Sequence, residues 1–154
     1  MTPVPFPRVE PLGGNRYRLF EAYAYVWVKD GARYRLTVPA GFENDLASVP
    51  RLLWVVVSPF DLGAAVIPHD WVYAWAGRLP PGSWEVWRDG GWAEDGRPWT
   101  RREADRLFGR LMREVGVARL RRRAAYLAVR LFGFFAWARA ARRVTAGAGP
   151  SASG

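Results

Sequence analysis

The sequence predicts an α+β fold, in which a small N-terminal antiparallel β-hairpin or sheet packs against three to four helices. Two observations support this prediction. Residues 16–38 carry strand-like runs around an Asp-Gly pair, whereas helix caps and helical periodicity occur only in later parts of the chain. With 154 residues, of which 50% are hydrophobic, the chain is long enough for one domain with its own core.

We expect that single domain to cover residues 15–143. Residues 1–14 contain several prolines, which interrupt regular structure, and are expected to form an extended arm. Residues 78–99 are rich in Gly, Pro and Trp and are expected to form an insertion, in which Asp89-Gly90 marks a small hairpin. Residues 144–154 are mostly Ala, Gly and Ser, which predicts a disordered tail.

The N-terminal hairpin is predicted from two runs of different character. Residues 16–28 are rich in aromatic and β-branched side chains, and residues 33–38 alternate between polar and apolar ones. Asp30-Gly31 lies between the runs, and this pair favours the tight turn of a hairpin.

Two helices are predicted before the C-terminal part of the chain. The first begins near Leu62 and meets Pro68, where it is expected either to kink or to be replaced by a new helix. Thr100 and Glu103 form a capping-box pattern that opens the second. The apolar face predicted for this second helix consists of Ala104, Leu107, Phe108, Leu111 and Met112.

A last helix is predicted over residues 117–143. Apolar residues recur along it at three- and four-residue steps, which predicts a stripe that docks on the domain core. Arg130 interrupts the only long apolar run, which is too short and too charged to span a membrane. The predicted docking stripe consists of Leu120, Ala124, Leu127, Leu131 and Phe134.

His69 is the only histidine in the sequence, and Asp70 and Tyr73 follow it within about one helical turn. A base, a carboxylate and a hydroxyl would thus lie close together. Two interpretations are open: a catalytic site, or a buried histidine whose hydrogen bonds are satisfied and which does no chemistry. Asp105 is another polar residue in an apolar helix face, so we expect it to pair with His69 across two antiparallel helices.

Several blocks occur in order along the chain: Gly41-Phe42-x-x-Asp45-x-Ala47-Ser48-Val49-Pro50-Arg51, Ala64-Ala65, His69-Asp70-x-x-Tyr73 and Arg102-x-Ala104-Asp105-x-x-Phe108. Together they resemble the domain-of-unknown-function family 1353 over residues 15–137. That family occurs largely in tailed bacteriophages and prophages, and its name gives no activity. The resemblance implies a phage-type protein; with no signal peptide visible, we expect a soluble protein in the virion or the host cytoplasm.

The blocks around His69 and Asp105 are also similar to the core of secreted-type phospholipase A. In that fold one helix bears His-Asp-x-x-Tyr and an antiparallel helix bears an Asp. The resemblance implies that His69 activates water, that Asp70 binds Ca²⁺, and that Tyr73 and Asp105 hold the far nitrogen of the imidazole. Asp45 could then offer a second oxygen ligand to the cation. The chain differs from that family in lacking cysteines and a glycine-rich calcium loop.

Two functional hypotheses follow. The first is an ester hydrolase of phospholipase type with the roles just described. A variant of it uses Ser48 as nucleophile, His69 as base and Asp105 as orienting acid, although Ser48 lacks the Gly-x-Ser-x-Gly turn. The second hypothesis is a non-catalytic virion or morphogenesis component whose His/Asp/Tyr cluster is structural.

Charge and composition limit the partners. Residues 97–154 hold 14 of the 23 basic residues but only 3 of the 14 acidic ones. Arg119 and residues 121–123, also arginines, precede several aromatic residues, a combination that suits an anionic membrane surface or another phage protein. Nucleic acid is less favoured because no nucleic-acid-binding motif is present. The absence of Cys excludes disulfides, thiolate nucleophiles and Cys-based zinc sites.

Overall fold

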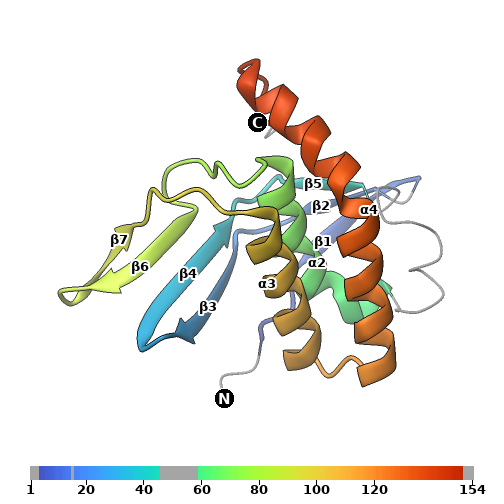
Figure 1. Cartoon of the computed structure of the whole chain (residues 1–154), viewed down its shortest axis with the longest axis horizontal. Helices are drawn as coiled ribbons and strands as arrows, with labels where there is room; N and C mark the ends of the chain where they lie inside the picture. Colours follow the sequence, from blue (N-terminus) through green and yellow to red (C-terminus); the bar gives the residue numbers. More distant parts are fainter. Residues whose placement is uncertain (1–3, 15, 46–58, 151–154) are drawn as a thin grey trace.

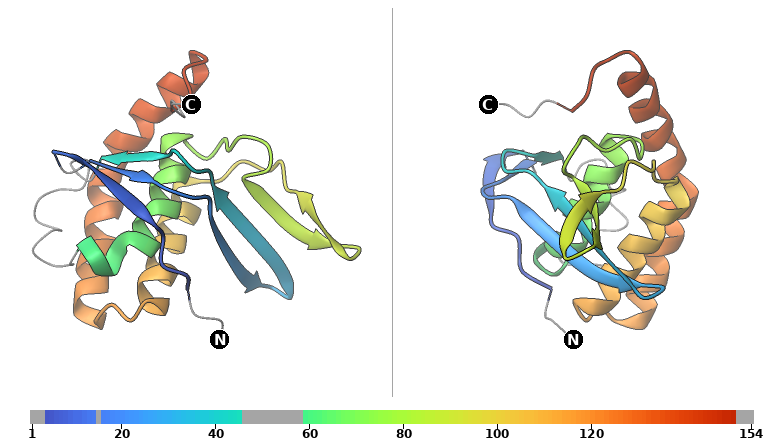
Figure 2. Two further views of the ribbon diagram at one scale, coloured as in Figure 1. Left: turned by 180° about the vertical axis from the view of Figure 1, so that it is seen from behind. Right: turned by 90° about the vertical axis from the view of Figure 1, so that its left-hand side faces the viewer.

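The computed structural model describes residues 4–14, 16–45 and 59–150. The described strands form two antiparallel sheets, and three long helices lie to one side of them (Figures 1 and 2). Helix α2 lies between the strands and the pair α3 and α4 (Figure 2). The α+β class predicted from the sequence is confirmed.

The smaller sheet contains β1 (Val9–Gly13), β2 (Arg16–Leu19) and β5 (Glu43–Asp45), with β2 in the middle. Strand β1 falls within the segment for which an extended arm was expected. Strand β5 brings the beginning of the 41–51 segment to the edge of this sheet, where Asp45 lies opposite Arg16. The Arg18 guanidinium forms an ion pair of 2.8 Å with Glu43, which links β2 to β5 through side chains as well as the backbone.

The larger sheet is built from two hairpins. Strands β3 (Tyr23–Lys29) and β4 (Ala32–Val38) form the first, and β6 (Trp84–Arg88) and β7 (Gly91–Glu94) form the second, in the order β3-β4-β6-β7. Both turns are the predicted Asp-Gly pairs. Their φ angles are positive, 52° and 78° for Asp30 and Gly31 and 50° and 82° for Asp89 and Gly90, as the two-residue hairpin turn requires. Both predicted hairpins are therefore confirmed.

Aromatic stacking connects the larger sheet to the chain that follows α2. Trp84 of β6 stacks on Tyr34 with ring centroids 5.0 Å apart, and Trp99 meets the edge of Trp84 at 4.8 Å. Both tryptophans are buried. The Trp-rich segment thus contributes these two side chains to the core. Gly77 makes a close approach possible here, because a Cβ at Gly77 would lie 2.0 Å from the backbone oxygen of Trp99.

Two antiparallel helices position the polar residues of interest (Figure 1). Helix α2 (Pro59–Ala74) continues through Pro68, so of the two alternatives for this position, a new helix beginning at Pro68 is excluded. Helix α3 (Arg101–Glu114) begins at Thr100 with both hydrogen bonds of the predicted capping box. The predicted apolar face of α3 is buried in full, together with Asp105.

Helix α4 (Arg119–Thr145) docks on α2 and α3, but not through the predicted stripe. Leu120 is 80% exposed and Leu131 68% exposed, and the rest of that stripe also faces solvent. The opposite side of the helix packs instead, because its small residues let α4 approach α2 closely. The docked face consists of Ala125, Tyr126, Val129, Gly133, Trp137 and Ala140.

None of the helices in the described part of the chain has both the length and the apolar character needed to cross a membrane.

The close contact between α4 and α2 predicts that one methyl group added at Gly133 lowers the stability of the fold. A Cβ at Gly133 would lie 2.5 Å from the Tyr73 hydroxyl, so Gly133→Ala should lower stability in spite of the better helix propensity of alanine. We expect a loss of about 1–3 kcal/mol in chemical denaturation.

Gly109→Ala is the matched control. It also lies within a helix, but its Cβ would meet the nearest atom, on the Tyr126 ring, at an ordinary 3.4 Å. We expect Gly109→Ala to be neutral or to gain up to about 1 kcal/mol. Equal effects of the two substitutions would contradict the described packing of α4.

Candidate functional site

Asp105 lies at the point where the three helices meet. Its side chain on α3 is 0% exposed, and it contacts His69 and Tyr73 from α2 and Arg130 from α4. An ionised carboxylate in such a place is unfavourable unless charges and hydrogen-bond donors surround it. The contacts of Asp105 supply both.

The two oxygens of Asp105 have different partners. Oδ1 accepts a hydrogen bond of 2.6 Å from the Tyr73 hydroxyl and lies 3.4 Å from His69 Nε2. Oδ2 accepts a bond of 2.7 Å from the Arg130 guanidinium, and Arg101 lies 3.6 Å from the same oxygen. The expected pairing of His69 with Asp105 across antiparallel helices is confirmed.

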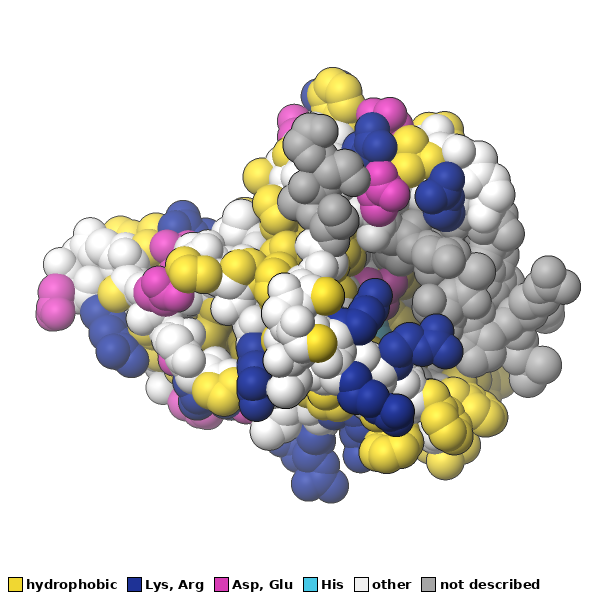
Figure 3. Space-filling model, turned by 90° about the horizontal axis from the view of Figure 1, so that it is seen from above, with side chains coloured by type: hydrophobic (Ala, Val, Ile, Leu, Met, Phe, Trp, Pro, Cys, Tyr) yellow, Lys and Arg dark blue, Asp and Glu magenta, His cyan; other side chains and the backbone are white. Residues whose placement is uncertain are grey.

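The two ring nitrogens of His69 lie in different environments. Nε2 faces the fully buried Asp105, whereas Nδ1 lies 3.1 Å from Asp70 Oδ1, and the Asp70 side chain is 23% exposed. The imidazole ring packs near Tyr73 and Phe108, with centroid distances of 4.3 Å and 4.8 Å. The His69 residue as a whole is 6% exposed and shows only as a small cyan area from above (Figure 3).

The charges and hydrogen bonds around His69 and Asp105 determine which of their atoms carry protons. Burial favours the neutral form of His69, but the hydrogen bonds and charges of Asp105 and Asp70 outweigh it and raise the pKa of His69 above its usual value. Burial likewise acts to raise the pKa of Asp105, and hydrogen bonds from His69, Tyr73 and Arg130 lower it overall. Because an ionised Asp105 can only accept, Nε2 of His69 carries a proton, and Nδ1 holds the lone pair whenever the ring is neutral.

Two contributors from α4 were missed in the sequence. Arg130 was interpreted only as a charge that interrupts an apolar run, yet it forms the shortest contact to Asp105 Oδ2. Gly133 lies one turn further on the same face and leaves space for the Tyr73 hydroxyl. A single arginine in an apolar helix, followed at i+3 by glycine, is the signal that could have identified them.

The structure brings together four of the predicted site residues: His69, Asp70, Tyr73 and Asp105. Ser48, the alternative nucleophile, lies outside the described residues. Asp45 ends strand β5, and the proposed calcium site between Asp45 and Asp70 stays a prediction. Among the described residues, His, Cys, Asp and Glu form no group of three or more that could hold a metal ion.

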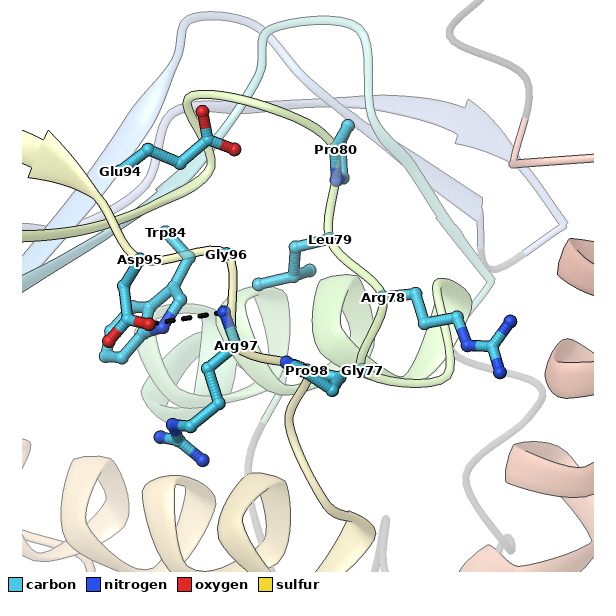
Figure 4. A pocket seen from close by; sticks show the side chains of 10 residues that line it. All are labelled: Gly77, Arg78, Leu79, Pro80, Trp84, Glu94, Asp95, Gly96, Arg97 and Pro98. Carbon is cyan, nitrogen blue, oxygen red and sulfur yellow. Dashed lines mark hydrogen bonds between the residues drawn. The ribbon is translucent and has the colours of Figure 1, made fainter.

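A hollow lies elsewhere, between the turn after α2 and the irregular segment that follows β7 (Figure 4). None of the four cluster residues lines it. Its rim combines Arg78, Glu94 and Arg97 with apolar side chains, and Arg78 points away from the hollow (Figure 4). The hollow therefore contributes nothing to the surroundings of His69.

Comparison with known proteins identifies the family. The family model described as "Protein of unknown function (DUF1353)" matches residues 17–129, which is most of the chain, and the protein belongs to this family. The match includes His69, Asp70, Tyr73 and Asp105 and ends one residue before Arg130. Neither a curated protein nor a solved structure matches the chain.

The shifted pKa values of His69 and Asp105 predict that the stability of the fold changes with pH in two separate ranges. The raised pKa of His69 means that its stabilising contribution is complete below the usual histidine pKa of about 6.5 and is lost as the pH rises through the higher folded value. The lowered pKa of Asp105 adds stability above about pH 4 that is lost as the pH falls through the lower folded value.

We therefore expect the melting temperature of the wild type to fall between about pH 6 and about pH 9 by more than that of His69→Gln. The comparison is made with a chelator present. Because His69 is the only histidine, no other imidazole contributes to the difference. Parallel pH curves for the two proteins would show that the two carboxylates do not raise the pKa of His69.

Proposed function

We propose that this DUF1353 protein is an ester hydrolase in which His69 activates a water molecule. The observation that supports this most is the difference between the two ring nitrogens: Nε2 faces the buried Asp105, and Nδ1 faces the partly exposed Asp70. A general base needs one nitrogen fixed in its tautomer and the other within reach of water. Asp105 supports a fixed tautomer at Nε2, and the partial exposure of Asp70 supports access of water to Nδ1.

The reaction would proceed in two steps. Neutral His69 accepts a proton at Nδ1 from water while the water oxygen bonds to the carbonyl carbon of the ester. The tetrahedral intermediate then breaks its bond to the alcohol oxygen, which takes the proton back from His69, and the products are a carboxylic acid and an alcohol. Asp105 stays ionised throughout and stabilises the imidazolium between the steps, while Tyr73 and Arg130 hold Asp105 in place.

The same contacts define the working pH range. Only the neutral ring accepts a proton, and Asp105 and Asp70 raise the pKa of His69. The hydrolysis rate should therefore increase with pH through a value above the ordinary histidine pKa of about 6.5. This direction is opposite to that of the stabilising effect of the same histidine.

A hard cation forms a second part of the proposal. Asp70 would supply one carboxylate ligand to Ca²⁺ and Asp45 another. Calcium takes about six to eight oxygen ligands, so these two side chains do not complete a shell. When bound, the cation would stabilise the negative charge that develops on the carbonyl oxygen.

The alternative function is a non-catalytic virion or morphogenesis component, as the phage-type resemblance implies. The observation that favours it is the near-complete burial of the cluster, in which one carboxylate links α2, α3 and α4. In that case His69 contributes only stability, and its loss has no catalytic consequence.

The hydrolase proposal is tested on vesicles of mixed phospholipids, with and without calcium, by measuring released fatty acid. We expect His69→Gln to lower the rate at least about 100-fold, which is the usual contribution of a general base. Asp89→Asn in the second hairpin turn is the control and should keep the wild-type rate. No hydrolysis by the wild type, combined with a lower melting temperature of His69→Gln, would support the structural alternative instead.

The calcium part is tested separately by thermal unfolding. A specific site that is filled at a free calcium concentration about 100 times its Kd should stabilise the wild type by about 2.7 kcal/mol. Asp70→Asn should remove this increase, because Asp70 would supply one of the charged ligands. An unchanged wild-type melting temperature would exclude the cation but leave the role of His69 open to the vesicle assay.

A further inference from the structure

We propose that helix α4 docks on the surface of an anionic lipid bilayer through its outward face. The apolar residues of that face, here called the outer stripe, are Leu120, Leu127, Leu131, Phe134 and Phe135. The proposal concerns binding only, and it holds whether or not the His69 cluster is catalytic.

The outer stripe is exposed to an unusual degree for such large apolar side chains. Phe135 is 73% exposed, and each of the other members has more than half of its surface in contact with solvent. Single exposed apolar residues are common on protein surfaces and need no explanation. A row of leucines and phenylalanines on one face of one helix is a contiguous patch, which is typical of an interaction site.

The stripe and the docked face lie on opposite sides of α4. Gly133 packs against Tyr73 of α2, whereas Leu131 and Phe134 are exposed. Arg130 also belongs to the docked side, because it pairs with Asp105. Substitutions in the outer stripe therefore leave the contacts of the Asp105 cluster intact.

Charge favours lipid phosphates as the partner. Helix α4 contains no acidic residue, and its arginines lie at both ends of the outer stripe. From above, hydrophobic side chains and Lys or Arg side chains lie next to one another along one edge of the molecule (Figure 3). Apart from Arg130, the arginines of the helix are Arg119, Arg121, Arg122, Arg123, Arg139, Arg142 and Arg143.

This pattern distinguishes a bilayer from a second copy of the chain. Two α4 helices packed through their outer stripes would bring two sets of arginines together with no carboxylate from either helix to neutralise them. A bilayer offers acyl chains to Leu and Phe and, nearer the water, phosphates to the guanidinium groups. The stripe extends over about 22 Å of a straight helix, which suits a flat surface.

The position of α4 in the fold allows such contact. The helix forms one outer edge of the described part of the molecule, and its C-terminal end extends beyond α2 and α3 (Figures 1 and 2). No other described element lies along its outward side in either view (Figure 2). None of the described elements therefore has to move for the helix to lie in the plane of the interface.

The experiment is cosedimentation of the full chain with vesicles of phosphatidylglycerol and phosphatidylcholine, against vesicles of phosphatidylcholine alone. We expect binding to the anionic vesicles to be at least about tenfold tighter and to weaken at least about tenfold between about 0.05 M and 0.5 M salt. We expect Leu127→Gln/Leu131→Gln/Phe135→Gln to weaken it at least about tenfold at constant charge. The His69→Gln variant keeps the whole outer stripe and should bind as the wild type does, which separates this result from that of the hydrolase test.

The matched control carries Phe20→Gln/Val26→Gln/Val28→Gln, three exposed apolar residues of the sheet region, and should bind normally. Full competition by polyglutamate or duplex DNA, with no effect of the outer-stripe variant, would show that the arginines bind polyanions and would overturn the proposal. Failure to bind anionic vesicles, or a lower melting temperature of the outer-stripe variant without a change in binding, would also overturn it.

Discussion

The arrangement of the helices depends on the charge of one buried carboxylate. Burying an ion costs several kcal/mol even after the surroundings relax, so Asp105 requires partners from every element that surrounds it. Helix α2 supplies His69 and Tyr73, and α4 supplies Arg130. Removing one partner of such a buried ion typically costs about 3–5 kcal/mol, more than most single apolar contacts contribute. The same requirement fixes the tautomer of His69, so the packing constraint and the candidate chemistry have one physical origin.

Local patterns in the sequence predicted the parts of the fold that depend on local chemistry. The two Asp-Gly turns, the Thr100 capping box and the buried face of α3 all follow from backbone preferences or from one clear periodicity. The pairing of His69 with Asp105 could also be predicted, because two polar residues in apolar helix faces are costly unless they meet.

The orientation of α4 could not be predicted in this way. Apolar and basic residues are both distributed around this helix, so periodicity pointed to the side with the larger apolar residues. The structure selects the other side, because Gly133 and neighbouring alanines permit close packing and because Arg130 must reach Asp105. Both reasons depend on residues of α2 and α3 that are distant in sequence, and hydrophobicity along α4 alone does not contain them.

The two apolar faces of α4 also have a consequence for folding. Before the pair between Arg130 and Asp105 forms, we expect the outer stripe, with its large apolar side chains, to compete with the docked face for the apolar face of α3. This non-native contact differs from the native one by a rotation of α4 through about half a circle about its own axis. Escape from such a contact requires α4 to detach, so we expect it to slow folding at low denaturant concentration. The buried ion pair with Asp105 is the contact that only the native rotation can satisfy.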